Sequence, residues 1–401
     1  MPETNPRPHP PVPGTAHDDG ARYRRALEGL LGVPATEGNR IEVLRNGEEI
    51  FPAMLEAIDA AEHTIDFLTY VYWSGEIAET FARALAARAK AGVRVRVLLD
   101  AVGSAPMDTA LMAEMEESGA KVERFRPVSP LHLGKVDHRT HRKVLVCDEA
   151  VGFTGGVGIA DEWKGAARNE HEWRDTHFRV RGPAVDGLRA AFVDNWGEAT
   201  GKLFDEGIDR FPLQPGDGPS CVQIVRGASE PGPSDIATLI HALVQLARKR
   251  IRITTAYFVP DEETTTLLCE AIGRGVEVQL LLPGPHADKR FVQLAGEHDY
   301  QTLLEAGVRI WNFQPSMLHA KIMTVDGLMA SVGSANLNSR SMSLDEEVNM
   351  AVLDPELVAE LDRHFDEDLE RSRELDLSNW EERSQVQKLA EKAAGIAGKQ
   401  F

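Results

Sequence analysis

The sequence predicts an α/β fold built from two similar α/β/α domains, each with a central mixed sheet, in a pseudo-two-fold arrangement. Helical segments alternate with short runs of branched apolar residues, a pattern typical of α/β layers. One series of helix and strand segments also occurs twice in the same order, which indicates a duplicated domain. Prolines and glycines gather between Phe204 and Asp235, so the junction of the two domains is expected there.

Each copy begins with the same helix–strand unit. In residues 50–63 apolar side chains recur at helical spacing, and residues 65–73 then have the composition of a strand. Residues 236–250 show the same helical spacing before a strand at residues 251–259. The matching order predicts that these two units occupy equivalent places in the two domains.

The next units repeat as well. Residues 81–100 and 266–283 each predict a helix that ends at a glycine, Gly92 or Gly275, before a strand rich in Val and Leu. A third pair of segments then shares the spacing G-x-x-apolar-x-x-F-x-P, in GAKVERFRP (119–127) and GVRIWNFQP (307–315). The repeat is therefore a whole domain and not a short solenoid unit.

The repeat divides the chain into four parts. Residues 1–40 begin with a stretch rich in Pro, Gly and Asp and are expected to be a disordered or weakly ordered tail. Residues 41–212 and 213–380 are expected to form the two domains, and residues 381–401 a C-terminal helical tail.

Composition excludes several classes of protein. Lys and Arg number 44 against 63 Asp and Glu, for a net charge of −19, which disfavours binding along a nucleic-acid backbone. The three cysteines are far apart without a CxxC pair, so no disulfide framework is expected and a reducing compartment is the default. The N-terminus lacks the apolar core of a secretory signal, and no run reaches the roughly 18 apolar residues of a membrane-spanning helix.

Both copies end with the motif His-x-Lys-x4-Asp inside a β-branched run, as His141, Lys143 and Asp148 and again as His319, Lys321 and Asp326. On a strand, residues i and i+2 lie on one face, so each histidine is paired with a lysine. An ammonium that neutralises phosphoryl oxygens beside an imidazole that attacks phosphorus or protonates a leaving oxygen suits a phosphate ester. Each aspartate lies beyond its strand, a position more typical of a residue that braces a turn.

With these motifs the sequence resembles the HKD phospholipase D superfamily, and within it the bacterial cardiolipin-synthase-like branch that lacks transmembrane helices. The likeness runs from about Glu48 to Leu353. The matching segments are THRK (140–143), FTGGVGIADEW (153–163), WRDTH (173–177), TTAYFVPD (254–261), MLHAKIMTVD (317–326), GSANLNSRS (333–341) and EEVN (346–349). The resemblance implies the phospholipase D fold, one active site between the two domains, and chemistry through a phosphohistidine without metal or cofactor.

The resemblance also implies roles by position. One histidine would attack phosphorus, and the other would first protonate the leaving alcohol and then activate the incoming one. The implied set is His141 as nucleophile, His319 as acid and base, Lys143, Lys321 and Asn336 on the phosphoryl oxygens, Glu347 and Asp175 as acidic partners of the histidines, and Asp148 and Asp326 completing the motifs. Gly158 stands where the superfamily motif has a second Asn, so the phosphate-binding amide occurs once and the halves are expected to differ in role.

Several features keep more than one interpretation. His138 and His141 could suggest a metal pair, but no third ligand stands at metal spacing, so no metal is expected. The ten extra residues of the first copy, between Pro127 and His141, could form a lid, a substrate-selecting loop or a plain surface loop. The aromatic residues that end the matching strands could line the cleft or fill the core; they are Tyr72, Trp73, Tyr257 and Phe258.

The leading functional prediction is a phosphatidyltransferase of the cardiolipin synthase type, which moves a phosphatidyl group between phospholipids. The alternatives are phospholipase D hydrolysis and, less favoured by the acidic chain, a phosphodiesterase or nuclease of the same superfamily. The expected partners are phospholipids at a membrane surface and not nucleic acid, and the expected location is cytoplasmic, peripheral at the inner face of the membrane. The sequence leaves the head groups and the oligomeric state open.

Overall fold

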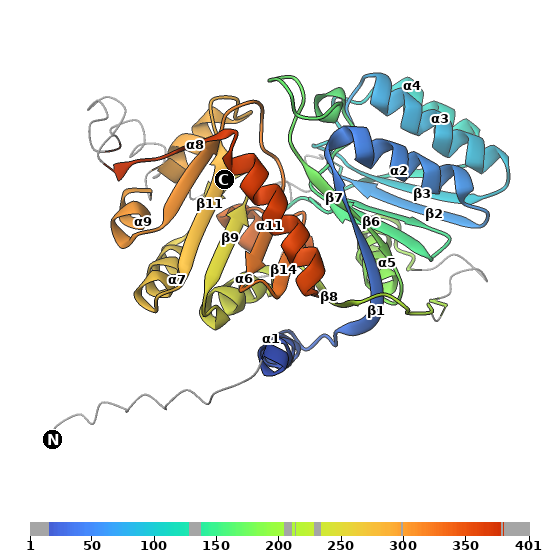
Figure 1. Cartoon of the computed structure of the whole chain (residues 1–401). Coiled ribbons are helices and arrows are strands. Elements are labelled where there is room, and N and C mark those ends of the chain that lie inside the picture. The colour runs from blue at the N-terminus through green and yellow to red at the C-terminus, as the bar shows by residue number, and fades with distance from the viewer. Residues whose placement is uncertain are drawn as a thin grey trace.

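The computed structural model describes residues 16–377, except 128–137, 204–210, 213, 228–233 and 298–299, together with residue 380. The chain folds into two similar halves that lie side by side (Figure 1). The first half comprises β1 (Thr36–Arg45), α2 (Asn46–Ala60), β2 (Thr64–Thr69), α3 (Glu76–Lys90), β3 (Arg94–Asp100), α4 (Thr109–Glu117), β4 (Lys121–Phe125), β5 (Val144–Cys147), β6 (Val151–Gly155), the short 3₁₀ helix η2 (Asp161–Trp163), β7 (Thr176–Arg181) and α5 (Ala184–Thr200).

The second half repeats this order. It comprises β8 (Ser220–Arg226), α6 (Asp235–Leu246), β9 (Arg250–Thr254), β10 (Phe258–Val259), α7 (Glu262–Gly273), β11 (Glu277–Pro283), α8 (Arg290–Glu297), α9 (Tyr300–Ala306), β12 (Arg309–Phe313), β13 (Ile322–Val325), β14 (Met329–Gly333), β15 (Leu337–Asn338), α10 (Ser339–Ser343), β16 (Val348–Leu353), α11 (Pro355–Leu369) and β17 (Ser372–Glu374). The duplication predicted from the sequence is therefore present in the fold.

Fifteen of the described strands form one mixed sheet in which the two halves are arranged alike, and β10 and β15 form a separate two-stranded sheet. Outward from β1 the order is β1-β7-β6-β5-β2-β3-β4, and outward from β8 it is β8-β16-β14-β13-β9-β11-β12, with β17 at the edge. The halves meet where β1 pairs antiparallel with β8, through Thr36 opposite Val222 and Asn39 opposite Ser220. The expected mixed sheets are thus confirmed, and they are joined edge to edge.

Helices cover both faces of each half, and the apolar cores follow these layers. In the first half α2, α3 and α4 pack over one core, and in the second half α6, α7 and α9 pack over another. A third core combines α5 and α11 with strands of both halves; among its members are Phe178, Leu188, Val222, Met350 and Leu361. This shared core holds the two halves together as one unit.

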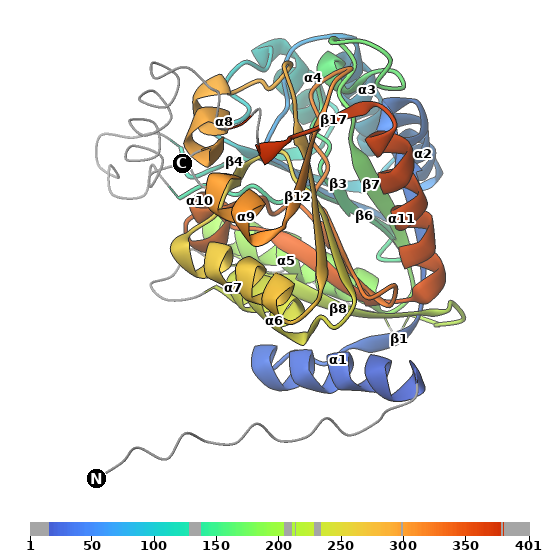
Figure 2. The same ribbon diagram turned by 60° about the vertical axis from the view of Figure 1, so that its left-hand side comes forward.

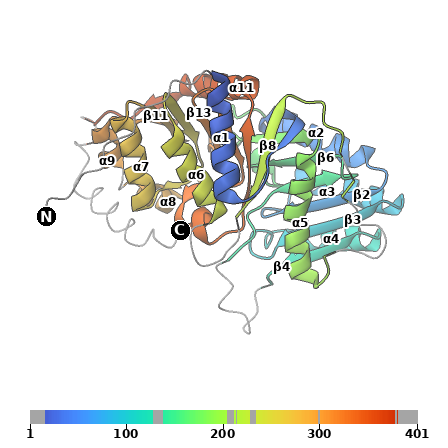
Figure 3. The ribbon, with the colours of Figure 1, turned by 90° about the horizontal axis from the view of Figure 1, so that it is seen from below.

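The N-terminal segment corrects one prediction. Residues 16–40, expected to be weakly ordered, form helix α1 (Ala16–Leu31) and the start of β1. Helix α1 lies against α6 of the second half (Figures 2 and 3). Tyr23 and Leu27, one helical turn apart, are buried there, and the Tyr23 hydroxyl donates a hydrogen bond to Asp326 at 2.8 Å. Burial of this apolar stripe stabilises a segment that composition alone made appear unstructured.

Two other predictions fall on residues that the structure does not describe. The C-terminal helical tail, residues 381–401, lies outside the described ranges, and so does most of the ten-residue insertion, at 128–137. Within the described ranges, none of the helices has both the length and the apolarity needed to span a bilayer.

Candidate active site

The two histidine–lysine pairs lie at equivalent ends of the two half-sheets. His141 and Lys143 precede β5, and β5 pairs antiparallel with β2 so that Val144 faces Leu68 near the end of that strand. His319 and Lys321 precede β13 in the same way, and Ile322 faces Thr254, the last residue of β9. Both pairs therefore lie beyond the carboxyl ends of parallel strands, the edge at which α/β proteins usually bind ligands.

Each histidine takes its acidic partner from the other half of the molecule. Nδ1 of His141 lies 2.9 Å from Oε1 of Glu347, and Nδ1 of His319 lies 2.9 Å from Oδ2 of Asp175. An ionised carboxylate only accepts hydrogen bonds, so Nδ1 of each imidazole carries the proton and donates it. Nε2 of each ring is thereby left with its lone pair for substrate.

Backbone hydrogen bonds fix the same exchange between the halves. The amide of His141 donates to the carbonyl of Glu346 at 2.9 Å, and the amide of His319 donates to the carbonyl of Arg174 at 2.7 Å. The chain just before each histidine is bridged in parallel to the other half, Thr140 with Glu346 and Leu318 with Arg174. One site is therefore assembled from both halves.

The two carboxylates are buried and fully engaged. Glu347 accepts hydrogen bonds from the hydroxyls of Ser334 and Ser341, and Asp175 accepts from the indole N–H of Trp163 at 2.8 Å. Burial alone would raise the pKa of both acids, but for each the hydrogen bond and charge of its histidine lower the pKa to about 2. Both acids are therefore ionised at neutral pH.

The imidazoles are neutral in the free protein. Burial lowers the pKa of His141 to about 3 against the opposing charge of Glu347, and it lowers the pKa of His319 to about 4. Lys321 contributes to the lowered pKa of His141, and Lys143 to that of His319. Each lysine thus acts on the histidine of the other half, as one shared site requires.

The two lysines also have lowered pKa values, so a bound anion can shift them toward the charged form. Burial lowers the pKa of Lys143 to about 8 and that of Lys321 to about 7, and Lys143 further lowers the pKa of Lys321. Nζ of Lys143 donates to the carbonyl of His141 at 2.8 Å. Nζ of Lys321 lies 3.2 Å from Nε2 of His319. Because the charge of Lys143 lowers the pKa of Lys321, a ligand that brings negative charge to both lysines is favoured.

Asp148 and Asp326 lie at the far ends of β5 and β13 and do not join this group. The Asp148 carboxylate accepts backbone hydrogen bonds from residues 62–64, which lead into β2. Asp326 accepts from the backbone of residues 248–250, which lead into β9. Both have positive φ, 50° and 57°. They brace the turns that start the parallel strands, so their membership of the catalytic set is corrected while the turn-bracing alternative agrees with these contacts.

Asn336 marks a real difference between the halves. Its side chain is buried, and its Oδ1 atom has no hydrogen-bond partner among the described residues. At the equivalent place, a Cβ atom on Gly158 would lie 2.6 Å from Cβ of Val71 and 3.2 Å from the indole of Trp163. No asparagine fits there, so the single amide follows from packing.

Aromatic rings surround His319 more than His141. The ring centres of Trp163, Trp173 and Tyr257 lie 5.2, 5.5 and 6.2 Å from that of His319, while Tyr70 lies 5.2 Å from His141. Trp163 and Trp173 were inside segments that carried the family resemblance but were not selected as site residues. Of the aromatic residues flagged from the strand ends, Tyr257 lines the site, whereas Tyr72 and Phe258 are buried core residues.

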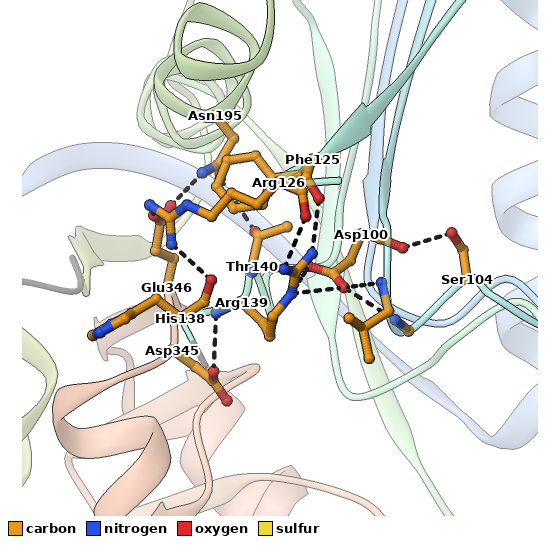
Figure 4. A network of polar contacts seen from close by, with 12 residues as sticks. Asp100, Ser104, Phe125, Arg126, His138, Arg139, Thr140, Asn195, Asp345 and Glu346 are labelled. Atoms are coloured by element: carbon orange, nitrogen blue, oxygen red, sulfur yellow. Dashed lines mark hydrogen bonds and ion pairs between the residues drawn. The ribbon is translucent and has the colours of Figure 1, made fainter. Parts of the chain in front are cut away.

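A second polar network surrounds residues 138–140, which come just before His141 in the chain (Figure 4). Arg139 donates from Nε to Asp100 at 3.0 Å and from its other nitrogens to the carbonyls of Phe125 and Arg126. Arg126 in turn donates to the carbonyl of His138 at 2.8 Å. The ends of the insertion are thereby fixed to one another and to β3.

The structure gives no support to a metal pair at His138. Its Nδ1 atom lies 3.3 Å from the carbonyl of Leu344. Among the residues described, no group of three or more His, Cys, Asp or Glu side chains is arranged to hold a metal ion.

Known proteins resemble this chain over most of its length. The family model described as "Cardiolipin synthase, PLD-like domain" matches residues 54–170 and 240–369. Cardiolipin synthase of Geobacillus kaustophilus (strain HTA426) is 35% identical over 365 residues, covering 90% of this chain and 72% of the relative. Cardiolipin synthase 1 of Bacillus cereus is 33% identical over 368 residues, with the same coverage of 90% and 72%.

Solved structures share the fold at low sequence identity. Phosphatidylserine synthase from Haemophilus influenzae Rd KW20 matches with a TM-score of 0.74 at 16% identity, over 95% of this chain and 100% of that one. Polyphosphate kinase from Porphyromonas gingivalis matches with a TM-score of 0.57 at 15% identity, over 90% of this chain and 53% of that one. These likenesses show that the fold of this chain also occurs in other solved structures.

Proposed function

This chain belongs to the family of cardiolipin synthases with PLD-like domains, and on that basis we propose that it moves a phosphatidyl group from one phospholipid to the hydroxyl of another through a phosphohistidine. The observation that carries the proposal is the crossed pairing of His141 with Glu347 and of His319 with Asp175. It supplies two neutral imidazoles of fixed tautomer beside two buried lysines.

In the first step, Nε2 of His141 attacks the phosphorus of the donor. A P–N bond forms, the bond from phosphorus to the leaving oxygen breaks, and His319 gives its Nε2 proton to the departing alcohol. His319 is neutral in the free protein, so it must first gain that proton. The anionic phosphodiester offsets the charge of Lys143 and Lys321, which raises the pKa of the adjacent imidazole and favours its protonation.

In the second step the roles reverse. His319, now neutral, takes the proton of the incoming lipid hydroxyl as its oxygen attacks the phosphohistidine. The P–N bond breaks, and Nε2 of His141 recovers its lone pair. Lys143, Lys321 and the amide of Asn336 hold the phosphoryl oxygens in both steps, where they stabilise the charge that develops in each transition state.

The same proposal places the protein at a phospholipid surface, peripheral at the inner, cytoplasmic face of the membrane. Support comes from the lipid substrates implied by the names of its relatives and from cysteine usage typical of a reducing compartment. The net charge of −19 opposes an anionic bilayer, so we expect weak, salt-sensitive attachment. Nucleic acid is not an expected substrate.

The test uses purified protein and mixed liposomes that contain mass-tagged phosphatidylglycerol, with lipid products identified by mass spectrometry. We expect tagged cardiolipin from the wild type and none from His141→Ala. If phosphatidic acid were the only tagged product, the reaction would be phospholipase D hydrolysis and not transfer. Product formation by His141→Ala at the wild-type rate would remove His141 from the reaction.

A further inference from the structure

Each catalytic carboxylate is preceded by a buried charged residue that the reaction does not use. Glu346 comes before Glu347, and Arg174 comes before Asp175. The two are equivalent by position, because Gly155 pairs with His177 in the first half and Gly333 pairs with Asn349 in the second. The two equivalent positions therefore carry opposite charges: the carboxylate of Glu346 in the second half and the guanidinium of Arg174 in the first half.

Glu346 is held by two side chains of the first half. Nη2 of Arg126 donates to its Oε1 at 2.6 Å, and Nδ2 of Asn195, from α5, donates to its Oε2. The backbone of Glu346 is fixed as well, since its amide donates to the carbonyl of Arg139 at 2.8 Å while its carbonyl accepts from His141. Glu346, drawn with Arg126 and Asn195 in Figure 4, thus ties the segment that leads into β16 to the peptide of His141.

Arg174, a cation of the first half, is held by a carboxylate of the second half. Its Nε and Nη2 atoms lie 2.9 and 2.8 Å from Oδ2 of Asp368, from α11. Asp368 also binds Arg45 at 2.7 Å. The backbone amide of Arg174 donates to the carbonyl of Met317 at 2.8 Å while its carbonyl accepts from His319. Arg174 therefore ties the peptide of His319 to the other half, as Glu346 ties the peptide of His141.

We propose that these two clamps, Glu346 with Arg126 and Asn195, and Arg174 with Asp368, are positioning devices that each set the alignment of one histidine and its carboxylate. Because the clamps have opposite charge, neither can form with the partners of the other. The proposal rests on the function proposed above and extends it, since disturbing one clamp should impair one histidine and spare the other.

The test separates the two histidines by the leaving group. Glu346→Gln and Asp368→Asn keep side-chain size and remove one charge from each clamp. Each variant is given two donors, phosphatidylglycerol and a phosphatidyl ester of p-nitrophenol, whose leaving group departs without a proton. The burst of p-nitrophenolate reports formation of the phosphohistidine alone, and thermal unfolding confirms that each variant is folded.

We expect Glu346→Gln to slow the first step about 10- to 100-fold with both donors, because a misaligned nucleophile affects every substrate. Asp368→Asn should slow it comparably with phosphatidylglycerol but less than about twofold with the activated donor, because protonation of the leaving group is then not needed. A KM close to the wild-type value should accompany both changes. A merely structural role would lower both activities equally in both variants.

The matched controls remove exposed partners of the same arginines. Glu198→Gln takes away the other carboxylate of Arg126, and Glu367→Gln takes away the other carboxylate of Arg45; both should keep wild-type rates with both donors. The positioning proposal would be overturned if Asp368→Asn, like Glu346→Gln, lost as much activity with the activated donor as with phosphatidylglycerol. It would also be overturned if neither variant lost activity. The reverse pattern, with the defect of Glu346→Gln cured by the activated donor, would keep the clamps and overturn the assignment of His141 as nucleophile.

Discussion

His141 and His319 are held as neutral rings, each with Nδ1 bound to a carboxylate and Nε2 free of that bond. A neutral imidazole is a nucleophile without prior deprotonation, and a carboxylate behind it stabilises the positive charge that it acquires during the reaction. Glu347 and Asp175 therefore determine the tautomer of each ring and its charge in the transition state.

Glu347→Gln tests this role directly. The amide can present its N–H to Nδ1 and so favour the wrong tautomer, and it removes the charge that stabilises the imidazolium. We expect kcat to fall by about 100-fold or more, measured as cardiolipin formed from phosphatidylglycerol, with KM changed little. A variant that keeps kcat within a few-fold of wild type while remaining folded would show that the carboxylate is dispensable.

The lysines predict a pH dependence for anion binding. The pKa of Lys321 is lowered to about 7 and that of Lys143 to about 8 by burial, so the free site loses its positive charges as the pH rises through this window. Tungstate should bind the protonated lysines, and its Kd should therefore increase by about tenfold per pH unit for each lysine above its pKa. Titration calorimetry between pH 6 and 9 measures this.

Lys321→Arg is the control for that titration, because a guanidinium stays charged over the whole range. It should remove the portion of the pH dependence that begins near pH 7. A tungstate affinity of the wild type that is constant from pH 6 to 9 would contradict the assignment of these lysines to the phosphoryl oxygens.

The site was only partly predictable residue by residue. The repeated spacing His-x-Lys identified His141, Lys143, His319 and Lys321, although each pair lies just before its strand and not within it. The crossed partnership of His141 with Glu347 depends on contacts between residues 206 positions apart, which no local pattern encodes. Trp163 and Trp173 beside His319 were missed for the same reason, whereas Tyr257 was among the aromatic residues expected at the cleft or in the core.

At the scale of single elements, Asp148 and Asp326 show how a motif can combine chemistry with folding. Each carboxylate binds the peptide N–H groups that lead into the neighbouring parallel strand, and Asp326 also receives the hydroxyl of Tyr23 from α1. Asp148 thus connects the end of β5 to the start of β2, and Asp326 connects the end of β13 to the start of β9. Sequence spacing alone could not separate this function from catalysis.

Replacement of these aspartates should affect stability and not chemistry. Asp148→Ala and Asp326→Ala each remove charge-assisted hydrogen bonds to three backbone N–H groups that are exposed or half-buried, which should lower the free energy of unfolding by about 1–3 kcal/mol. Urea denaturation followed by fluorescence measures this loss, and kcat under native conditions should stay within about twofold of wild type. Asp217→Ala, which removes an exposed carboxylate, should leave the denaturation midpoint unchanged; a kcat loss of 100-fold in the folded aspartate variants would return Asp148 and Asp326 to the reaction.

The whole molecule is a duplicated fold in which each half supplies the carboxylate that binds the histidine of the other. The order of helices and strands could be predicted well because the repeat shows each element twice, whereas α1 was missed because its apolar stripe is short and follows a polar, proline-rich start. The joined sheet and the core shared by α5 and α11 were also not predictable, since both arise between halves that the sequence presents as separate.

One complete site per chain leads to a prediction for mixtures. His141→Ala and His319→Ala proteins, each inactive alone, should stay inactive when they are mixed, because the carboxylate and the second histidine that complete each site come from the same polypeptide. Cardiolipin formation by the mixture and by each variant is the measurement. Recovery of substantial activity on mixing would mean that sites form between chains.

The core shared by α5 and α11 has a further consequence for the catalytic cycle. Rotating one half away from the other would transfer this apolar layer into water, at a cost of about 25 cal/mol for every Å² exposed. A hinge motion of the kind that opens many two-domain enzymes is therefore unfavourable here. In the reaction proposed above, the exchange of one alcohol for the other would therefore take place with the two halves held together by this core.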